Sequence, residues 1–201
     1  MRLQEAKRDL YRRLANERGY RSRAAFKLME INRSYHIIRR GMYVVDLGCA
    51  PGGWLQVARK FVGGHANILG IDAKPVKPLP NIQVVQGDIN DLSLVEKILS
   101  IMRRKVDLVL SDVAPNIMGV WQLDHARQIG LTENAITIAD KILVKDGNAV
   151  FKVYEGSMLN DLRNILKEKF RVVRSYKPRA SRKASSEIYL VCLGYKGYEQ
   201  I

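Results

Sequence analysis

Features that mark secreted, membrane-spanning and zinc-binding proteins are scarce in this sequence. Its 201 residues include two cysteines, Cys49 and Cys192, too few for a disulfide framework or a cysteine-based zinc site. No apolar run is long enough to span a bilayer, and the first residues lack the apolar core of a signal peptide. The three histidines are scattered along the chain, so we expect no metal site. These absences predict a cytoplasmic protein.

Internal repeats, low-complexity tracts and linkers rich in proline or serine are also absent. The composition, 47% apolar and 27% charged, is typical of a globular protein. The length suits one ordinary α/β domain and is small for two. We therefore predict a single domain over residues 1–201, with a basic helical extension at 1–40 and the core at 41–201, and we expect a monomer.

Positive charge is concentrated in two segments. The net charge is +14, and residues 1–40 contribute +8 through 12 basic and 4 acidic residues. Residues 163–183 contribute another +8, with 9 basic residues against Glu168 alone, so the rest of the chain sums to −2. An ion-pair-rich surface, the alternative, would mix the signs. Two separate basic segments favour a polyanionic partner, a nucleic acid.

Apolar periodicity predicts two N-terminal helices followed by strands that alternate with helices. The helices are expected at 5–19, 22–35, 53–62, 93–103, 126–144 and 157–168, and the strands at 42–47, 67–72, 82–87, 106–112, 148–153, 170–176 and 187–195. Such alternation is typical of an α/β fold, a mostly parallel sheet with helices on both faces. No helix separates the last two strands, so we expect them to pair antiparallel. Ligands of such sheets bind outside the carboxyl ends of the strands.

A glycine-rich turn, "DLGCAPGGW" (46–54), follows the first strand. Its glycines, Gly48, Gly52 and Gly53, allow tight turns and a close approach of the backbone to a ligand. The segment matches neither the G-x-G-x-x-G dinucleotide motif nor a Walker A loop. The turn therefore predicts a ligand site of another kind.

Carboxylates end or follow the first three strands, at Asp46, Asp72 and Asp88. Each of them could serve only as the N-cap of the following helix. Together, around a glycine turn, they suit an adenosine that carries a positive charge, because carboxylates attract a cation and bind ribose hydroxyls. S-adenosyl-L-methionine, a sulfonium, fits this pattern better than NAD or ATP.

A lysine interrupts the apolar strand in "GNAVFKVYEG" (147–156). Burying the charge of Lys152 is costly, so either its ammonium group reaches solvent or the strand end needs it. Asp112, in "SDVAPN" after the fourth strand, and Glu187, at the start of the last strand, are expected near the same edge. Lys27, in the second helix, could reach that edge from outside the sheet.

Six segments in order, "YRSRAAFKL", "VVDLGCAPGGW", "QGDI", "LSDVAPN", "FKVYEG" and "SRKASSEIYLV", resemble the FtsJ/RrmJ family of ribose 2′-O-methyltransferases. The resemblance implies a Rossmann-like methyltransferase fold, a seven-stranded sheet with its last strand antiparallel, and S-adenosylmethionine as cofactor. It implies a catalytic tetrad of Lys27, Asp112, Lys152 and Glu187. The implied cofactor contacts are Gly52, Trp54, Asp72, Asp88 and Asp112, with Asp46, Gly48, Pro51 and Gly53 as additional candidates.

Bacterial members of that family modify a uridine ribose in large-subunit ribosomal RNA, so the resemblance implies this reaction and this partner. In it, Lys152 would orient and deprotonate the ribose hydroxyl, and burial and the charge of Lys27 would favour a neutral amine. Alternatives are tRNA ribose methylation and a non-catalytic RNA-binding assembly factor. RNA contacts are expected at Arg21, Arg23, Arg179, Arg182 and Lys183.

Overall fold

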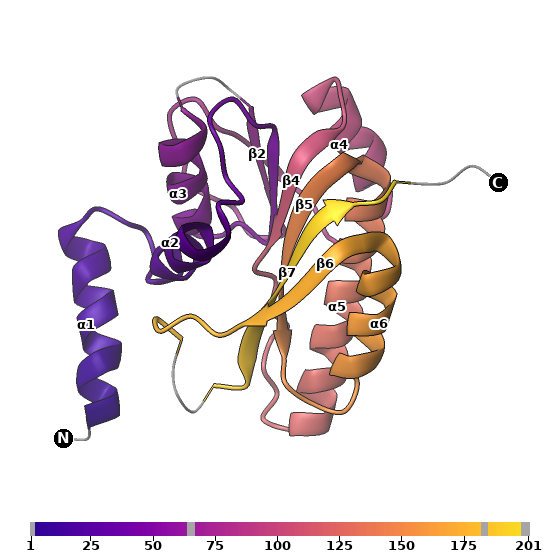
Figure 1. The fold of residues 1–201 in the computed structure, drawn as a ribbon. Coiled ribbons are helices and arrows are strands. Elements are labelled where there is room, and N and C mark those ends of the chain that lie inside the picture. Colours follow the sequence, from indigo (N-terminus) through magenta and orange to yellow (C-terminus); the bar gives the residue numbers. More distant parts are fainter. Residues whose placement is uncertain (1–2, 64–66, 182–184, 198–201) are drawn as a thin grey trace.

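One seven-stranded sheet lies between two layers of helices in the computed structural model, which describes residues 3–63, 67–181 and 185–197 (Figure 1). The strands are β1 (Val44–Leu47), β2 (Ile68–Asp72), β3 (Gln83–Gln86), β4 (Val106–Ser111), β5 (Leu143–Tyr154), β6 (Phe170–Tyr176) and β7 (Glu187–Tyr195). Their order across the sheet is β3-β2-β1-β4-β5-β7-β6. Neighbours from β3 to β5 pair parallel, whereas β7 runs antiparallel to both β5 and β6. The predicted mostly parallel sheet with an antiparallel last strand is confirmed.

The helices divide between the two faces of the sheet. They are α1 (Leu3–Glu17), α2 (Ala24–Tyr35), α3 (Gly53–Val62), α4 (Leu94–Met102), α5 (Trp121–Ile142) and α6 (Leu159–Lys169). Residues of α2 and α3 pack on one face, and residues of α4, α5 and α6 pack on the other (Figure 1). Helix α1 lies outside these layers and contacts α2, where the rings of Tyr11 and Phe26 are 5.6 Å apart.

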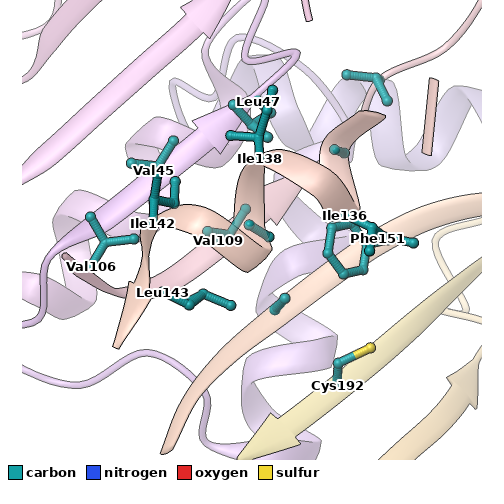
Figure 2. Packing of buried hydrophobic residues seen from close by; sticks show 14 of the residues in the cluster. Val45, Leu47, Val106, Val109, Ile136, Ile138, Ile142, Leu143, Phe151 and Cys192 are labelled. Carbon is teal, nitrogen blue, oxygen red and sulfur yellow. The ribbon is translucent and has the colours of Figure 1, made fainter. Parts of the chain in front are cut away.

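The larger core lies between the sheet and α5. Val45 and Val109, from adjacent strands, face Ile138 and Ile142 of the helix, and all four are fully buried (Figure 2). Burying each such side chain contributes about 1.5–3 kcal/mol relative to its exposure. Because both faces of the central strands are covered, these strands read as continuous apolar runs, which is the pattern by which they were predicted.

The junction between α5 and β5 differs from the sequence prediction. The helix was predicted over 126–144 and the strand over 148–153, whereas β5 begins at Leu143, directly after the helix. Leu143 pairs with Val106 of β4, and the pairing shifts register before Asn148. Pairing with β4, a long-range contact, therefore ends the helix earlier than local periodicity indicates.

Candidate functional site

A cleft of about 400 Å³ lies at the carboxyl end of the parallel strands. It is lined by residues at or just after the ends of β1, β2, β3 and β4, among them Gly48, Asp72, Asp88 and Asp112. Its volume is within the range of small-molecule sites. Three carboxylates in its lining give it a negative character, which suits a cationic ligand.

Two of these carboxylates also hold the loops around the cleft. Asp72 accepts the backbone N–H of Ala50 through Oδ2 and that of Lys74 through Oδ1, both at 2.8 Å. Asp88 Oδ1 accepts the backbone N–H of Asn90 at 2.9 Å and its side-chain amide at 2.8 Å. The N-cap interpretation is wrong for both aspartates, because the N-cap residues of α3 and α4 are Gly52 and Ser93. Both side chains instead organise loop backbone and line the cleft.

Asp46 has a different environment from the other strand-end carboxylates. It is fully buried in β1, it is not among the residues that line the cleft, and neither of its oxygens has a hydrogen-bond partner within the described residues. Burial, together with the negative charges of Asp112 and Asp72, raises the pKa of Asp46 well above its usual range. The protonated form of Asp46 is therefore favoured in the folded protein relative to an exposed aspartate.

The paired glycines of the turn make room for the N-terminal segment. A Cβ atom on Gly52 would lie 2.9 Å from Arg21 Nη1, and one on Gly53 would lie 2.3 Å from Ser22 Oγ. Next to them, Trp54 is 2% exposed, and its indole N–H donates to the carbonyl of Ala24 at 2.9 Å. This part of the turn fastens α3 to the segment before α2, a use that sequence reasoning did not find. Pro51 precedes it and is exposed.

Arg21 makes several backbone contacts at this junction. Its guanidinium donates to the carbonyls of Lys77 at 2.6 Å, Pro78 at 2.8 Å and Pro51 at 3.3 Å. It therefore holds the turn to the loop after β2. Among the other predicted RNA contacts, Arg23 directly precedes α2 and Arg179 is exposed, while Arg182 and Lys183 lie outside the described residues.

Lys152 does not reach into solvent. It is 6% exposed, and its ammonium group donates to the carbonyl oxygen of Asp112 at 2.6 Å and lies 3.1 Å from Oδ1 of the same residue. The backbone carbonyl of Lys152 accepts hydrogen bonds from Gln128 at 3.0 Å and Thr132 at 3.2 Å, both in α5. Strand and helix together thus fix this lysine beside the cleft-lining Asp112.

A second ion pair joins Lys27 of α2 to Glu187 of β7. The same oxygen of Glu187 accepts the Ser181 hydroxyl at 3.1 Å. Burial by itself raises the pKa of Glu187, but the charge and hydrogen bond of Lys27, the charge of Lys152 and the bond from Ser181 outweigh it and lower this pKa. Glu187 is therefore ionised and fixes the position of Lys27.

Tyr189 links the two ion pairs, and sequence reasoning missed it. Its fully buried hydroxyl lies 3.0 Å from Oδ1 of Asp112 and 3.2 Å from Oε1 of Glu187. Burial, with the negative charges of both carboxylates, raises the pKa of Tyr189 well above its usual value, so the phenol keeps its proton. The available signal was its position two residues after Glu187, because alternate residues of a strand share a face.

All four residues of the predicted tetrad therefore meet in one network, with two lysines, two carboxylates and balanced charge. Such an arrangement can hold a polar substrate group and accept or guide its proton. Within the described ranges, no group of three or more histidine, cysteine, aspartate or glutamate side chains could hold a metal ion. None of the helices in those ranges is long and apolar enough to cross a membrane.

Comparison with known proteins relates the chain to methyltransferases. The family model described as FtsJ-like methyltransferase matches residues 20–195. The chain is 48% identical over 197 residues to ribosomal RNA large subunit methyltransferase E of Nitrosopumilus maritimus, covering 98% of this chain and 100% of that protein. It is 45% identical to the protein of the same name from Methanocaldococcus jannaschii, covering 96% and 81% of the two chains.

A solved structure is similar as well. A Plasmodium falciparum protein, whose crystal structure is described as that of a ribosomal RNA methyltransferase, superimposes with a TM-score of 0.79 at 32% identity. The match covers 89% of this chain and 100% of that one.

Proposed function

The chain belongs to the FtsJ-like methyltransferase family, and from this premise we propose that it transfers a methyl group from S-adenosylmethionine to the 2′-oxygen of a uridine ribose in large-subunit ribosomal RNA. The observation that carries the proposal is the buried Lys152 side chain, bound to Asp112 at the edge of the cleft. Relatives named ribosomal RNA large subunit methyltransferase E support the substrate class.

S-adenosylmethionine fits the residues that line the cleft. In this proposal Asp72, at the end of β2, would bind the ribose hydroxyls, and Asp88, after β3, would bind the adenine amino group. Asp112, after β4, supplies negative charge for the sulfonium. When bound there, the cofactor supplies an activated methyl group. We propose Gly48 and Ala50 as backbone contacts, with Gly52 and Trp54 supporting the turn behind them.

The tetrad would prepare the ribose hydroxyl for the transfer. In our proposal, Lys152 takes the hydroxyl proton or guides it toward solvent, while Asp112 holds the lysine in place. Lys27, fixed by Glu187, contributes a second positive charge that stabilises a developing alkoxide. Tyr189 keeps the carboxylates in register and stays protonated throughout.

The basic segments would bind the RNA backbone. Arg179 lies on the loop after β6 and is exposed, and Ser181 of the same loop contacts Glu187. Phosphate contacts from this loop and from α1 would position a substrate at the tetrad without reading its sequence. We further propose that the protein acts in the cytoplasm as a monomer, since one domain carries both the cleft and the basic surfaces.

The test is a transfer assay with radiolabelled S-adenosylmethionine, offered separately to unmodified large ribosomal subunits, their naked RNA and unmodified tRNA. Label on a uridine 2′-oxygen from the large subunit is the expected result. Label in tRNA alone would mean that the substrate is tRNA, while the proposed ribose methylation would still hold. Cofactor binding without transfer to any RNA would overturn the enzyme proposal in favour of an RNA-binding assembly factor.

A further inference from the structure

Beyond the tetrad, the carboxyl end of the sheet carries an aromatic stack formed by Trp121, His125 and Tyr154. Trp121 begins α5, and its ring lies 5.6 Å from that of His125 at an interplanar angle of 16°. The ring of Tyr154 lies 6.0 Å from that of Trp121 at 25°. His125 is 5% exposed, whereas Trp121 is 46% exposed. The stack therefore supports a large indole from below and leaves much of it open to solvent.

The stack adjoins the catalytic strand end. Tyr154 follows Lys152 by two residues on β5 and pairs with Glu187 across the sheet. Burial first, and then the charges of Glu187, Asp124 and Asp112, raise the pKa of Tyr154, against an opposing contribution from Lys152. The tyrosine thus lies in the electrostatic field of the tetrad, and Trp121 lies immediately outward from it.

The position of Trp121 is held by its surroundings. The carboxylate of Asp124 accepts the backbone N–H groups of Met118 at 2.8 Å and Gly119 at 3.0 Å, which ties the preceding loop to the first turn of α5. Under the stack, a Cβ atom on Gly156 would lie 2.4 Å from Cε1 of His125, so only glycine lets the strand end approach the ring this closely. Both ring nitrogens of His125 are buried without a partner among the described residues, so the ring serves as a flat packing surface.

Exposed apolar area of this kind needs an occupant. Ile117 is 73% exposed and Val120 is about half exposed, so the apolar surface continues from the indole onto the loop before α5. Positive side chains lie nearby: Arg127, exposed on α5, contacts Met118 in the loop before the helix, and Lys177 forms an ion pair with Glu155, the residue after Tyr154. An indole beside cations on a strongly basic protein matches the two parts of a single-stranded nucleic acid, flat bases and phosphates.

We propose that Trp121 is a stacking platform for an unpaired nucleobase of the RNA substrate, next to the ribose that enters the tetrad. The inference rests on the proposed function and adds to it how the substrate is presented. A 2′-hydroxyl can enter a buried tetrad only if its nucleotide leaves the helical stack, and an aromatic ring replaces part of the stacking that is lost. The platform therefore selects a loop, bulge or other unpaired segment over a continuous duplex.

Tryptophan fluorescence tests the platform directly, because the chain has two tryptophans and Trp54 is buried. A single-stranded oligouridylate should quench the emission of the wild-type protein, whereas a blunt RNA duplex of equal length should not. In Trp121→Phe the quenching should disappear while the dissociation constant, measured by anisotropy of labelled RNA, stays within about three-fold, since phenylalanine still stacks. In Trp121→Leu the constant should rise about five- to a hundred-fold.

Leu123→Ala is the matched control, since Leu123 is 49% exposed on the same turn. We expect it to change neither RNA affinity nor cofactor affinity, and calorimetric binding of S-adenosylmethionine should be unchanged in all three variants. Equal loss of RNA binding in Leu123→Ala and Trp121→Leu would overturn the platform in favour of a general apolar contact, as with a protein partner. Loss of cofactor binding in Trp121→Leu would overturn it in favour of a structural role.

Different results would refute the enzyme proposal and the Trp121 platform. If the wild-type protein is quenched by oligouridylate but methylates no RNA, the enzyme proposal falls and the platform stands. If it methylates large-subunit RNA, but Trp121→Leu binds and methylates that RNA like the wild type, the platform falls and the enzyme proposal stands.

Discussion

Each end of the sheet carries a lysine, an aspartate and a tyrosine that contact one another: Lys152, Asp112 and Tyr189 at the carboxyl end, and Lys169, Asp140 and Tyr195 at the opposite end. The lysine–aspartate distances are similar, 3.1 Å and 2.9 Å, and so are the tyrosine–aspartate distances, 3.0 Å and 2.7 Å. The same three residue types thus build both groups, so composition alone does not distinguish a group beside a ligand cleft from a structural contact.

Position distinguishes the two groups. The lysine side chain is 7% exposed at the carboxyl end and 32% exposed at the opposite end. Asp112 lines the cleft, and Tyr189 connects it to the second ion pair of Lys27 and Glu187. Asp140, by contrast, joins the end of α5 to the end of α6. Strand direction places the first group where ligands bind, and the second group fastens helices to the sheet.

Replacing the two lysines in parallel should give the largest difference between the two groups. Lys152→Ala should lower the rate of methyl transfer at least about 1,000-fold with little change in S-adenosylmethionine affinity, because it removes the group that we propose handles the proton. Lys169→Ala should leave the rate per folded molecule unchanged and lower the free energy of unfolding by roughly 1–3 kcal/mol. Single-turnover transfer and urea denaturation measure the two effects. Near-normal turnover in Lys152→Ala would refute the assignment.

Glu187→Gln should affect both activity and acid stability. We expect a roughly ten-fold lower transfer rate, since Lys27 loses its fixed position. The folded-state pKa of Glu187 is lowered, so its stabilising contribution is complete above the unfolded-state pKa and is lost as pH falls through the folded-state value. Denaturation from about pH 6 to about pH 3 should therefore show a flatter profile for the variant.

Glu155→Gln is the control for that experiment, because the Glu155 side chain is 54% exposed in its pair with Lys177. Its stability profile should follow that of the wild type. A profile for Glu187→Gln as steep as that of the wild type would mean that other carboxylates dominate acid unfolding.

Asp46→Asn should change the pH dependence of stability in the direction opposite to that of Glu187→Gln. The folded-state pKa of Asp46 is raised, so the wild-type protein loses stability as pH rises above the unfolded-state pKa, and the amide avoids this loss. We expect a free energy of unfolding higher by about 1 kcal/mol or more at pH 7, with the difference shrinking toward pH 4. Urea denaturation at several pH values measures it. A destabilised variant at pH 7 would show that Asp46 is ionised and bound to a partner.

The smallest effects are expected for two arginines near the carboxyl end of the sheet. Arg21 binds backbone carbonyls, whereas Arg179 is exposed. Arg21→Ala should raise the dissociation constant for S-adenosylmethionine about two- to five-fold, because hydrogen bonds that hold the turn at Pro51 are lost. Arg179→Ala should leave cofactor affinity unchanged, weaken RNA binding and reduce the salt dependence of that binding by about one unit of slope. Calorimetry and binding at several salt concentrations distinguish them. The reverse pattern would exchange their roles.

Local pattern was sufficient for most elements of the fold. Apolar, β-branched runs predicted all seven strands of the described chain to within a few residues, apart from the start of β5, where pairing with β4 extends the strand back to Leu143. The order of the strands depends on which segments pair over long distances. Periodicity carries no information on that order, and the insertion of β7 between β5 and β6 is visible only in the folded sheet.

For the site, sequence alone determined which residue types stand at the strand ends: the glycine turn, the carboxylates after successive strands, and a lysine inside an apolar strand. Only the tertiary structure decided their environments. It buried Asp46, turned Arg21 toward backbone carbonyls, and placed Tyr189 between two ion pairs from segments as far apart as Lys27 and Glu187. The physical reason is that charge state and hydrogen bonding depend on burial and on neighbours from distant segments, which no local pattern encodes.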